Sequence, residues 1–292
     1  MKMKTKGDAV FEIINTVFLL SVCVLTVYPL IYTLSISLSS MAEAARTGLH
    51  LYPKEITFAS YKMVVRPESF YRQYLNTVLR TVMGTVLGLL VTSMFAYAIS
   101  RKKMPHRNIL MKITLFTMLF SGGTIPAYLN IMNLGLIDSF WALILPCLIS
   151  AYNVIIMRSF FMGIPESLIE SAQIDGANDF RVFFSIVLPI SKAVMATIGL
   201  WLAVMHWNAW FDAMLYINNP NKQVIQNLLR ELIMENSTTF VDQGIVKTDV
   251  MDFTPETIKA ATIIVTMLPI LCVYPFVQRY FVKGVTIGAV KG

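Results

Sequence analysis

The long run of mostly apolar residues from Phe11 to Leu34 constrains the fold of this chain more than any other feature. A helix needs about 20 such residues to cross the hydrocarbon core of a bilayer, and only a helix satisfies its backbone hydrogen bonds there without water. The lysines before the run (Lys2, Lys4 and Lys6) resemble the start of a signal peptide. However, the run is too long for one, and no small-residue cleavage site follows at the usual distance. We therefore expect a retained transmembrane helix.

Further apolar runs follow the first, and the composition of the whole chain also indicates a membrane protein. The 292 residues are 56% hydrophobic and 14% charged, whereas soluble domains are roughly 45–50% apolar and about 25% charged. A soluble globular protein is therefore excluded. We expect an all-α polytopic membrane protein, formed as a single domain over residues 1–292, with six spans at about residues 11–34, 75–99, 109–131, 139–158, 192–214 and 257–281.

Charge indicates the orientation of these spans. The connection between the second and third spans is basic and has no acidic residue: it carries Arg101, Lys102, Lys103, Arg107 and Lys112. The positive-inside rule places it in the cytoplasm. The N-terminal lysines and the basic C-terminal tail (Arg279, Lys283, Lys291) then lie on the same side, so both termini are expected to be cytoplasmic. The connection between the fifth and sixth spans is mainly acidic, as an outside loop permits.

The net charge of +7 has a second possible meaning, which is nucleic-acid binding. The basic residues lie in short blocks beside apolar runs, so membrane orientation explains them better, and we expect no nucleic-acid partner.

Glycine and proline interrupt several spans: Gly122, Gly123 and Pro126 in the third, Pro146 in the fourth, and Pro269 and Pro275 in the sixth. Such breaks occur at ordinary kinks and also beside a wet transport pathway, and both explanations stay open.

The most polar cytoplasmic stretch is the loop at residues 159–191. Pro165 suits the first turn of a helix, acidic residues follow it, and Gly176 suits the left-handed residue that ends one. Either Asn178 or Asp179 can cap a second helix, which would continue until Pro189 stops it. The second helix would contain Phe183, Phe184, Ile186 and Val187. The pattern predicts a helix-turn-helix with an acidic, small-residue elbow.

This loop resembles the EAA loop of permeases in type I ABC importers, which reads E-A-A, three residues, G, nine residues, I, one residue, L-P. The matching positions are Glu170, Ala172, Gly176, Ile186, Leu188 and Pro189. Ser171 departs from the pattern by standing where it has alanine. In that family the loop docks on a separate ATPase. The resemblance therefore implies that Glu170, Ser171, Ala172 and Gly176 form or shape the ATPase contact, with Asp175 as an accessory. The alternative is an amphipathic connector with solvated acids.

Three other segments extend the resemblance over nearly the whole chain: SGGTIPAYLNIMNLGLIDSFWALILP, HWNAWFDAMLY and QRYFVKGVTIGAVKG. They are similar to carbohydrate-importer permeases of the maltose-permease type, closest to the LplC- or YtcP-like group. The resemblance implies the type I permease fold in the bacterial cytoplasmic membrane, a homologous second permease subunit, and two ATP-binding-cassette ATPase domains. It also implies an extracytoplasmic solute-binding protein that delivers a sugar or oligosaccharide. ATP and Mg would bind the partner ATPase, and no cofactor would bind this chain.

The fifth span contains the candidates for a substrate pathway. At helical spacing Trp201, Asn208 and Asp212 share one face with Met205. Aromatic rings stack on the C–H faces of sugars, and amides or carboxylates bind hydroxyls. The alternative is that these residues mark a membrane interface, where tryptophan gathers.

Weaker pathway candidates lie elsewhere. They are His206 in the same span, Tyr152 and Asn153 in the fourth span, and Asn76 and Arg80 near the start of the second. An interhelical hydrogen bond is the alternative role for Asn153, and anchoring at the membrane interface is the alternative for Asn76 and Arg80.

The sequence argues against an enzyme. Its histidines (His50, His106, His206) and its cysteines (Cys23, Cys147, Cys272) are scattered, so neither a metal site nor a disulfide is expected, and no Walker A sequence is present. The remaining alternative is a stand-alone secondary transporter or channel driven by an ion gradient. Such a protein is expected to carry ionisable relays within its spans, and these spans are nearly free of them.

Overall fold

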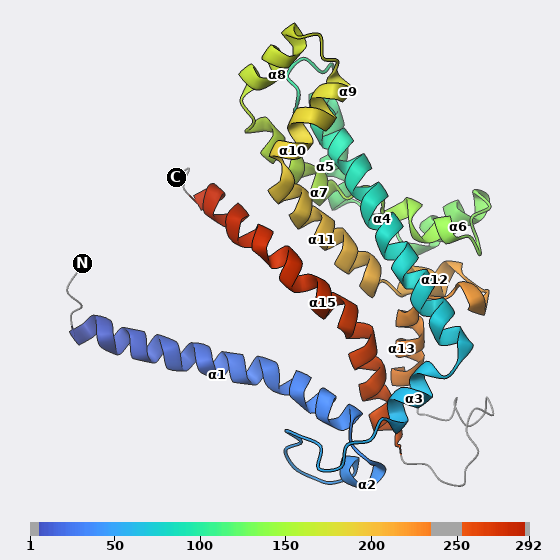
Figure 1. Cartoon of the computed structure of the whole chain (residues 1–292). Coiled ribbons are helices and arrows are strands. Elements are labelled where there is room, and N and C mark those ends of the chain that lie inside the picture. Colours follow the sequence, from blue (N-terminus) through green and yellow to red (C-terminus); the bar gives the residue numbers. More distant parts are fainter. Residues whose placement is uncertain (1–5, 235–252, 290–292) are drawn as a thin grey trace. The chain divides into compact units, whose positions relative to one another are not determined.

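The computed structural model describes residues 6–234 and 253–289 (Figure 1). These residues are mainly helical, and their one β-feature is an isolated bridge between Ser39 and Ile56, so the all-α prediction is confirmed for them. The expected acidity of the connection between spans five and six rests largely on residues 235–252, which lie outside the described residues. Lys2, Lys4 and Lys291, which helped to predict the orientation of the termini, also lie outside the described residues.

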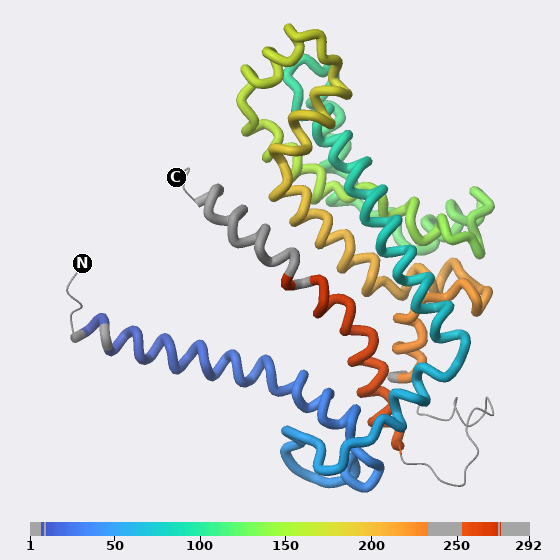
Figure 2. The backbone as a smooth tube through the Cα atoms, viewed as in Figure 1, coloured from blue at the N-terminus to red at the C-terminus, as the bar shows by residue number. Residues whose placement is uncertain are grey.

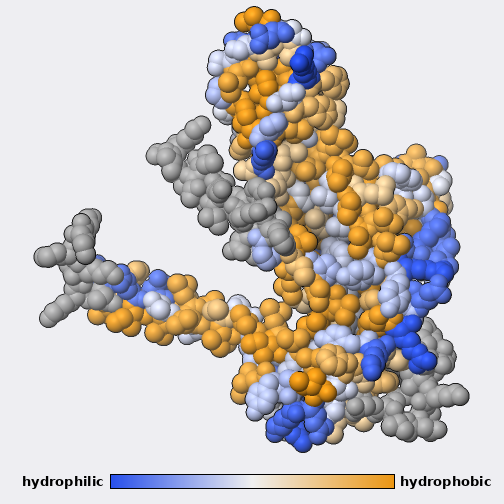
Figure 3. All heavy atoms as spheres, viewed as in Figure 1, coloured by the Kyte–Doolittle hydropathy of each residue, from blue (hydrophilic) through white to orange (hydrophobic). Residues whose placement is uncertain are grey.

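Contacts divide the chain into two compact units. The first consists of residues 1–70 and 229–268. It contains α1 (Lys6–Ser37), α2 (Met41–Ala44), α3 (Ala59–Val65) and the first part of α15 (Pro255–Ala289). In α1 the most apolar stretch is not buried within this unit, and hydrophobic residues cover most of its visible surface (Figure 3). Its length and composition are those of a helix that can cross a membrane.

A buried carboxylate organises the segment that follows α1. Glu43 is only 6% exposed, and its oxygens accept hydrogen bonds from the backbone N–H groups of Lys54 at 2.8 Å and of Glu55 at 3.0 Å. The hydrogen bond from Glu55 is the main reason that the pKa of Glu43 lies below its ordinary value. The Ser60 hydroxyl donates to Thr257 Oγ1 at 2.8 Å and so joins α3 to the start of α15.

The second unit consists of residues 71–228 and 269–292. Its helices are α4 (Glu68–Ser100), α5 (Arg107–Leu119), α6 (Thr124–Asn133), the 3₁₀ turns η1 (Phe140–Leu143) and η2 (Leu145–Cys147), α7 (Ala151–Met162), α8 (Glu166–Ile174), α9 (Asp179–Val182), the π-helix η3 (Phe183–Val187), α10 (Leu188–Ile190), α11 (Lys192–Asn208), α12 (Phe211–Tyr216), η4 (Pro220–Lys222) and the start of α13 (Ile225–Met234) up to Leu228.

The six expected spans are only partly visible as single helices. Three helices among the described residues are long and apolar enough to cross a membrane: Val10–Ser37, Glu68–Ser100 and Pro255–Val273. The number rises to six if three bent pairs each form one span: α5 with α6 at 117°, η1–η2 with α7 at 50°, and the helical stretch Asp179–Ile190 with α11 at 85°. Figure 2 shows the backbone along these turns.

Glycine and proline act differently in these breaks. Gly122 and Gly123 interrupt the third apolar stretch as expected, and Gly123 has φ +87°, a region that favours glycine. Pro269 and Pro275 lie inside the continuous helix α15 and do not end it.

The main core of the second unit lies where the last turns of α4 meet α7, η3 and α11. Its buried residues include Ala96, Ile99, Val154, Met157, Phe161, Ile169, Val187, Ile198 and Leu202. Ile169 belongs to α8, so this core extends into the polar loop at residues 159–191. The loop is therefore packed onto the helices rather than loosely attached to them.

Candidate functional site

The elbow of the EAA-like loop has a well-defined geometry. Helix α8 begins at Glu166 directly after Pro165 and ends at Ile174. Gly176 has φ +81°, its N–H donates to the Gln173 carbonyl at 3.0 Å, and the Ala177 N–H donates to the Ala172 carbonyl at 2.9 Å. These two bonds form a Schellman motif, which requires a left-handed residue at the glycine position. The predicted short helix with a glycine end is confirmed.

The second helix of the loop begins as predicted but ends later. Asn178 caps α9 by accepting a hydrogen bond from the Arg181 N–H at 2.9 Å. The expectation that Pro189 stops the helix is wrong, because α10 contains Pro189 and continues to Ile190. The π-helix η3 ends at Val187, two residues before this proline. A wider turn there is one way to accommodate a residue that has no N–H.

The two sides of α8 have different environments. Ile169 is 2% exposed and packs into the main core. Residues of the motif lie on the open side: Glu170, Ser171, Asp175 and Gly176 are exposed, and Ala172 is half-buried. The structure thus brings all five predicted docking residues into one elbow.

Two exposed apolar residues of the elbow escaped the sequence analysis. Ile174 at the end of α8 is 86% exposed, and Phe180 in α9 is 65% exposed. Large apolar side chains in a polar loop typically mark an interaction surface. The signal was present in the sequence, because Ile174 stands alone between polar residues, but its exposure depends on which side of α8 faces the core.

The pathway candidates of the fifth span do not share one helix. Helix α11 ends at Asn208, the backbone of Ala209 is extended, and α12 begins at Phe211. The helical spacing that joined Asn208 to Asp212 therefore does not apply, and this inference was wrong. Within α11 the spacing holds, because Trp201 (38% exposed) and Asn208 both lie exposed along one side of the helix with Met205.

The two aromatic candidates lie next to each other. Tyr152 in α7 stacks on Trp201 in α11, with 5.8 Å between the ring centroids and 29° between the ring planes. Tyr152 is 52% exposed, so the pair presents open ring surface. Asn153, its neighbour, is 6% exposed, which leaves little of it open to a solute, and the interhelical hydrogen bond weighed for it stays a prediction.

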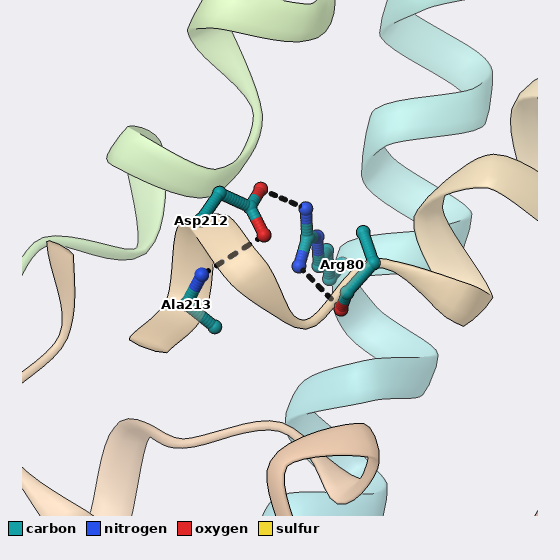
Figure 4. Close-up of polar contacts among 4 residues, drawn as sticks. Arg80, Asp212 and Ala213 are labelled. Carbon is teal, nitrogen blue, oxygen red and sulfur yellow. Dashed lines mark hydrogen bonds and ion pairs between the residues drawn. The ribbon is translucent and has the colours of Figure 1, made fainter. Parts of the chain in front are cut away.

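Asp212 takes part in a partly buried ion pair that was not predicted from the sequence (Figure 4). The Arg80 guanidinium in α4 contacts Asp212 Oδ2 through Nη2 and donates from Nη1 to the Ala209 carbonyl at 3.1 Å. Arg80 is fully buried, so the idea that it anchors α4 at the membrane interface is wrong. A single side chain thus satisfies both the free carbonyl at the end of α11 and the acid in the first turn of α12.

A close helix contact lies beside this pair. A Cβ atom placed on Gly84 would come within 2.4 Å of His206 Nε2, so the imidazole packs directly against the α4 backbone. His206 is fully buried, and neither ring nitrogen has a partner among the described residues. Gly84 and Gly88 form a G-x-x-x-G pattern, which permits close approach of helices in membranes. This pattern was the sequence signal for the contact.

Asp138 fixes the turn that follows α12. Its Oδ1 accepts hydrogen bonds from the backbone N–H groups of Asn218 at 2.6 Å and Asn219 at 2.8 Å, and its carbonyl accepts one from Lys222 Nζ at 2.6 Å. The hydrogen bond from Asn219, followed by that from Asn218, holds the pKa of Asp138 below its ordinary value of 3.8. Asp138 has φ 59°, a left-handed conformation that aspartate and asparagine tolerate better than most residues.

The described residues contain no group of three histidine, cysteine or acidic side chains that could hold a metal ion.

Known proteins are similar to this chain over nearly its whole length. The family model described as "Binding-protein-dependent transport system inner membrane component" matches residues 1–287. Protein LplC of Bacillus subtilis (strain 168) is 41% identical over 289 residues, covering 99% of this chain and 97% of LplC. The polygalacturonan/rhamnogalacturonan transport system permease protein YtcP of the same strain is 41% identical over 288 residues, covering 98% of this chain and 99% of YtcP.

A solved structure is also similar over nearly its full length. It is a chain from a bacterial ABC transporter involved in the import of the acidic polysaccharide alginate, with TM-score 0.90 and 33% identity, and the match covers 96% of this chain and 100% of that one. The fold is therefore that of a type I ABC importer permease, as the sequence resemblance implied. With nearly all of its residues matched, this chain belongs to the family of inner membrane components of binding-protein-dependent transport systems.

Proposed function

We propose that this chain forms half of the translocation pathway for a sugar or oligosaccharide in an ATP-driven importer of the bacterial cytoplasmic membrane. The whole chain would act as one permease domain with both termini in the cytoplasm. A homologous second permease would form the other half. An extracytoplasmic solute-binding protein would deliver the solute, and two ATP-binding-cassette domains on other chains would hold ATP and Mg. The chain itself would carry out no catalysis.

The observation that carries the coupling role is the two-sided character of α8. Its core side is fixed by Ile169, which is buried against α4 and α7, whereas Glu170 and Asp175 on the open side carry negative charge into solvent. An element that transmits a movement must be held firmly at one face and be accessible at the other. We propose that the open face docks in a groove of the ATPase.

The residue types on the open face suit such a contact. Ser171 and Ala172 allow close approach of a partner backbone, and the carboxylates can meet basic groups. Ile174 adds an apolar surface that a partner would cover, since 86% of it is exposed. Gly176 keeps the turn that presents all of them, and we extend the proposed docking surface to Ile174 on this basis.

For the pathway we propose a surface built around the stacked rings of Tyr152 and Trp201. Asn208 lies further along the exposed side of α11 and can exchange hydrogen bonds with sugar hydroxyls. Asp212 is partly exposed, with 21% of its side chain accessible, and its contact with Arg80 gives it a structural role beside any contact with solute. Asn153 would support the pathway from within α7.

The named relatives suggest which solutes to test. One is named for transport of polygalacturonan and rhamnogalacturonan, and the similar solved structure is of an importer of the acidic polysaccharide alginate. We propose an oligosaccharide, with uronic-acid oligomers as the first candidates and neutral oligomers as the comparison.

The test is uptake by the assembled importer in sealed vesicles. We expect uptake of a radiolabelled oligosaccharide that requires both ATP and the binding protein and that persists after ionophores collapse all ion gradients. Uptake that follows an ion gradient without ATP would overturn the proposal and support a secondary transporter instead.

A further inference from the structure

A cavity of about 490 Å³ lies between the end of α4 and the second helix of the EAA-like loop. One wall comes from the last turns of α4 and the connection to α5, with Met94, Ala98 and Met104. The other wall comes from Phe180 and Phe183. Such a volume is typical of pockets that hold small molecules. None of the roles proposed above uses this cavity.

The chemistry of the cavity changes along its length. Met94 and Ala98 give it an apolar interior, whereas Arg101 and Lys103 line it at the end of α4. Seven residues of helix separate Met94 from Arg101, which corresponds to about 10 Å along the axis. Helix α4 is long and apolar enough to span a membrane, so the apolar part of the cavity lies along its last turns and the cationic part lies at and just beyond its end.

A buried hydroxyl adds a second indication of a ligand. Tyr97 lines the cavity and is 7% exposed, and its hydroxyl has no hydrogen-bond partner among the described residues. A buried hydroxyl without a partner costs free energy, so a bound group that accepts its hydrogen bond would be favoured. The ring is fixed in place by Phe183, whose centroid lies 5.3 Å away, and the Arg101 guanidinium lies 6.0 Å from its centroid.

The charges that face the cavity sum to a positive value. Arg101 and Lys103 oppose one carboxylate, Asp179, which accepts a hydrogen bond from Gln173 at 3.3 Å. The neighbouring Lys102 pairs with Glu166 at 3.3 Å and contributes no net charge. A ligand that matches all of this has an anionic oxygen-rich head and an apolar chain.

We propose that this cavity is a binding site for one anionic phospholipid of the inner leaflet, with its phosphate between Arg101, Lys103 and the Tyr97 hydroxyl and an acyl chain along Met94 and Ala98. The lipid would contact both α4 and the docking loop, so that anionic lipid stabilises the loop in its docked arrangement. The inference rests on the proposed cytoplasmic position of this loop.

The experiment places the assembled importer in nanodiscs that contain phosphatidylcholine and a photoactivatable phosphatidylglycerol. We expect cross-links in the peptides that contain Met94–Met104 and Phe180–Phe183, and weaker labelling by a photoactivatable phosphatidylcholine. Because each cation near an anionic lipid contributes substantially, replacing both (Arg101→Gln with Lys103→Gln) should lower labelling by about tenfold or more.

Two matched variants make the result specific. Lys102→Gln removes a cation that does not line the cavity and should leave labelling within about twofold of the wild type. Ala98→Phe fills the interior without changing any charge and should abolish labelling of these peptides. Only variants that still assemble, as judged by gel filtration with the partner subunits, are compared.

Equal labelling by the two lipids, or labelling unchanged in both cavity variants, would overturn the lipid site. A cross-link from Phe180→Cys to a partner subunit, in place of lipid, would overturn it as well. ATP-driven uptake in the same preparation separates the two proposals: normal uptake without lipid labelling refutes only the lipid site, whereas specific labelling without ATP-driven uptake refutes only the transport function.

Discussion

Arg80 in α4 and Asp212 in α12 form an ion pair across the break that separates α11 from α12. The same guanidinium donates to the Ala209 carbonyl within the break. The kink is therefore held from outside by a helix that lies far away in the sequence, and the shape of the proposed pathway beyond Asn208 depends on this contact.

Removing one member of this ion pair should lower the free energy of unfolding substantially. Arg80→Met leaves the Asp212 carboxylate without its partner, and we expect a loss of about 3–5 kcal/mol in unfolding free energy. The double variant with Asp212→Leu should lose clearly less than the sum of the single changes. Calorimetric unfolding of the detergent-purified importer measures these differences, and strictly additive losses would contradict a coupled pair. The exposed pair of Lys102 and Glu166 provides the control, because Lys102→Met should cost less than about 1 kcal/mol.

The close contact between Gly84 and His206 predicts that alanine at Gly84 destabilises the protein more than alanine at Gly88. Gly84→Ala forces the new methyl group onto the imidazole and should destabilise the importer by about 1–3 kcal/mol, as overpacking does. Gly88→Ala is the matched control, because its Cβ would meet its nearest neighbours, the Leu148 carbonyl and a Leu202 methyl group, at 3.4 Å. His206→Ala should rescue Gly84→Ala. Equal effects of the two glycine changes on the melting temperature would show that the close approach is not tight.

How far the sequence predicted the structure depends on the range of the interactions. The elbow of the loop was predictable because Pro165, Gly176 and Asn178 act within a few residues of their own positions. The break after Asn208 was not, because it contains neither glycine nor proline and is stabilised by Arg80. The sequence offered no means to pair Arg80 with Asp212, so the arginine was weighed as an interface anchor.

The third apolar stretch shows an intermediate case. Gly122 and Gly123 predicted a break correctly, but the 117° angle between α5 and α6 depends on tertiary packing. Similarly, the five residues of the docking motif were predictable as a group, whereas the exposure of Ile174 required knowledge of which side of α8 faces the core.

The lowered pKa of Asp138 predicts a pH-dependent turn. A carboxylate whose pKa is lowered by folding stabilises the folded form above its ordinary value of 3.8 and loses this contribution as the pH falls through the folded pKa. Asp138→Asn keeps a residue that tolerates the left-handed backbone but removes the charge. At neutral pH the amides of Asn218 and Asn219 should exchange several-fold faster in this variant than in the wild type.

Hydrogen-exchange mass spectrometry of the peptide around residues 216–224 measures this difference. The ratio between variant and wild type should approach one at a pH below the folded pKa of Asp138, because both side chains are then neutral. A ratio of one at neutral pH would contradict the role of the carboxylate in the turn.

The stacked rings of Tyr152 and Trp201 predict an effect on transport rather than on folding. Trp201→Ala should lower oligosaccharide uptake about fivefold, because stacking of an aromatic ring on a flat partner contributes roughly 1 kcal/mol, while ATP hydrolysis by the complex persists. Trp201→Phe should retain most uptake. Trp141→Ala is a control for loss of an exposed tryptophan outside this pair, and an equal loss in both alanine variants would argue against a specific sugar surface.

The coupling role proposed for the EAA-like elbow can be tested with a matched pair of glycine variants. Gly176 and Gly135 both have positive φ, +81° and +67°, and a Cβ at either position would meet no atom within 4 Å. Valine at either site therefore introduces similar backbone strain, about 1–2 kcal/mol. Only Gly176 lies in the proposed docking surface, whereas Gly135 lies between α6 and η1. Glu170→Lys complements them, because it reverses a charge of the docking surface and leaves the backbone unchanged.

The most direct measurement is the amount of ATPase that remains bound when the permease pair is purified through a tag on this chain. We expect Gly176→Val and Glu170→Lys to lose most of the ATPase, whereas Gly135→Val retains it at the wild-type level. Full retention of the ATPase in both elbow variants, together with wild-type ATP-driven uptake, would show that the elbow does not couple this chain to the ATPase.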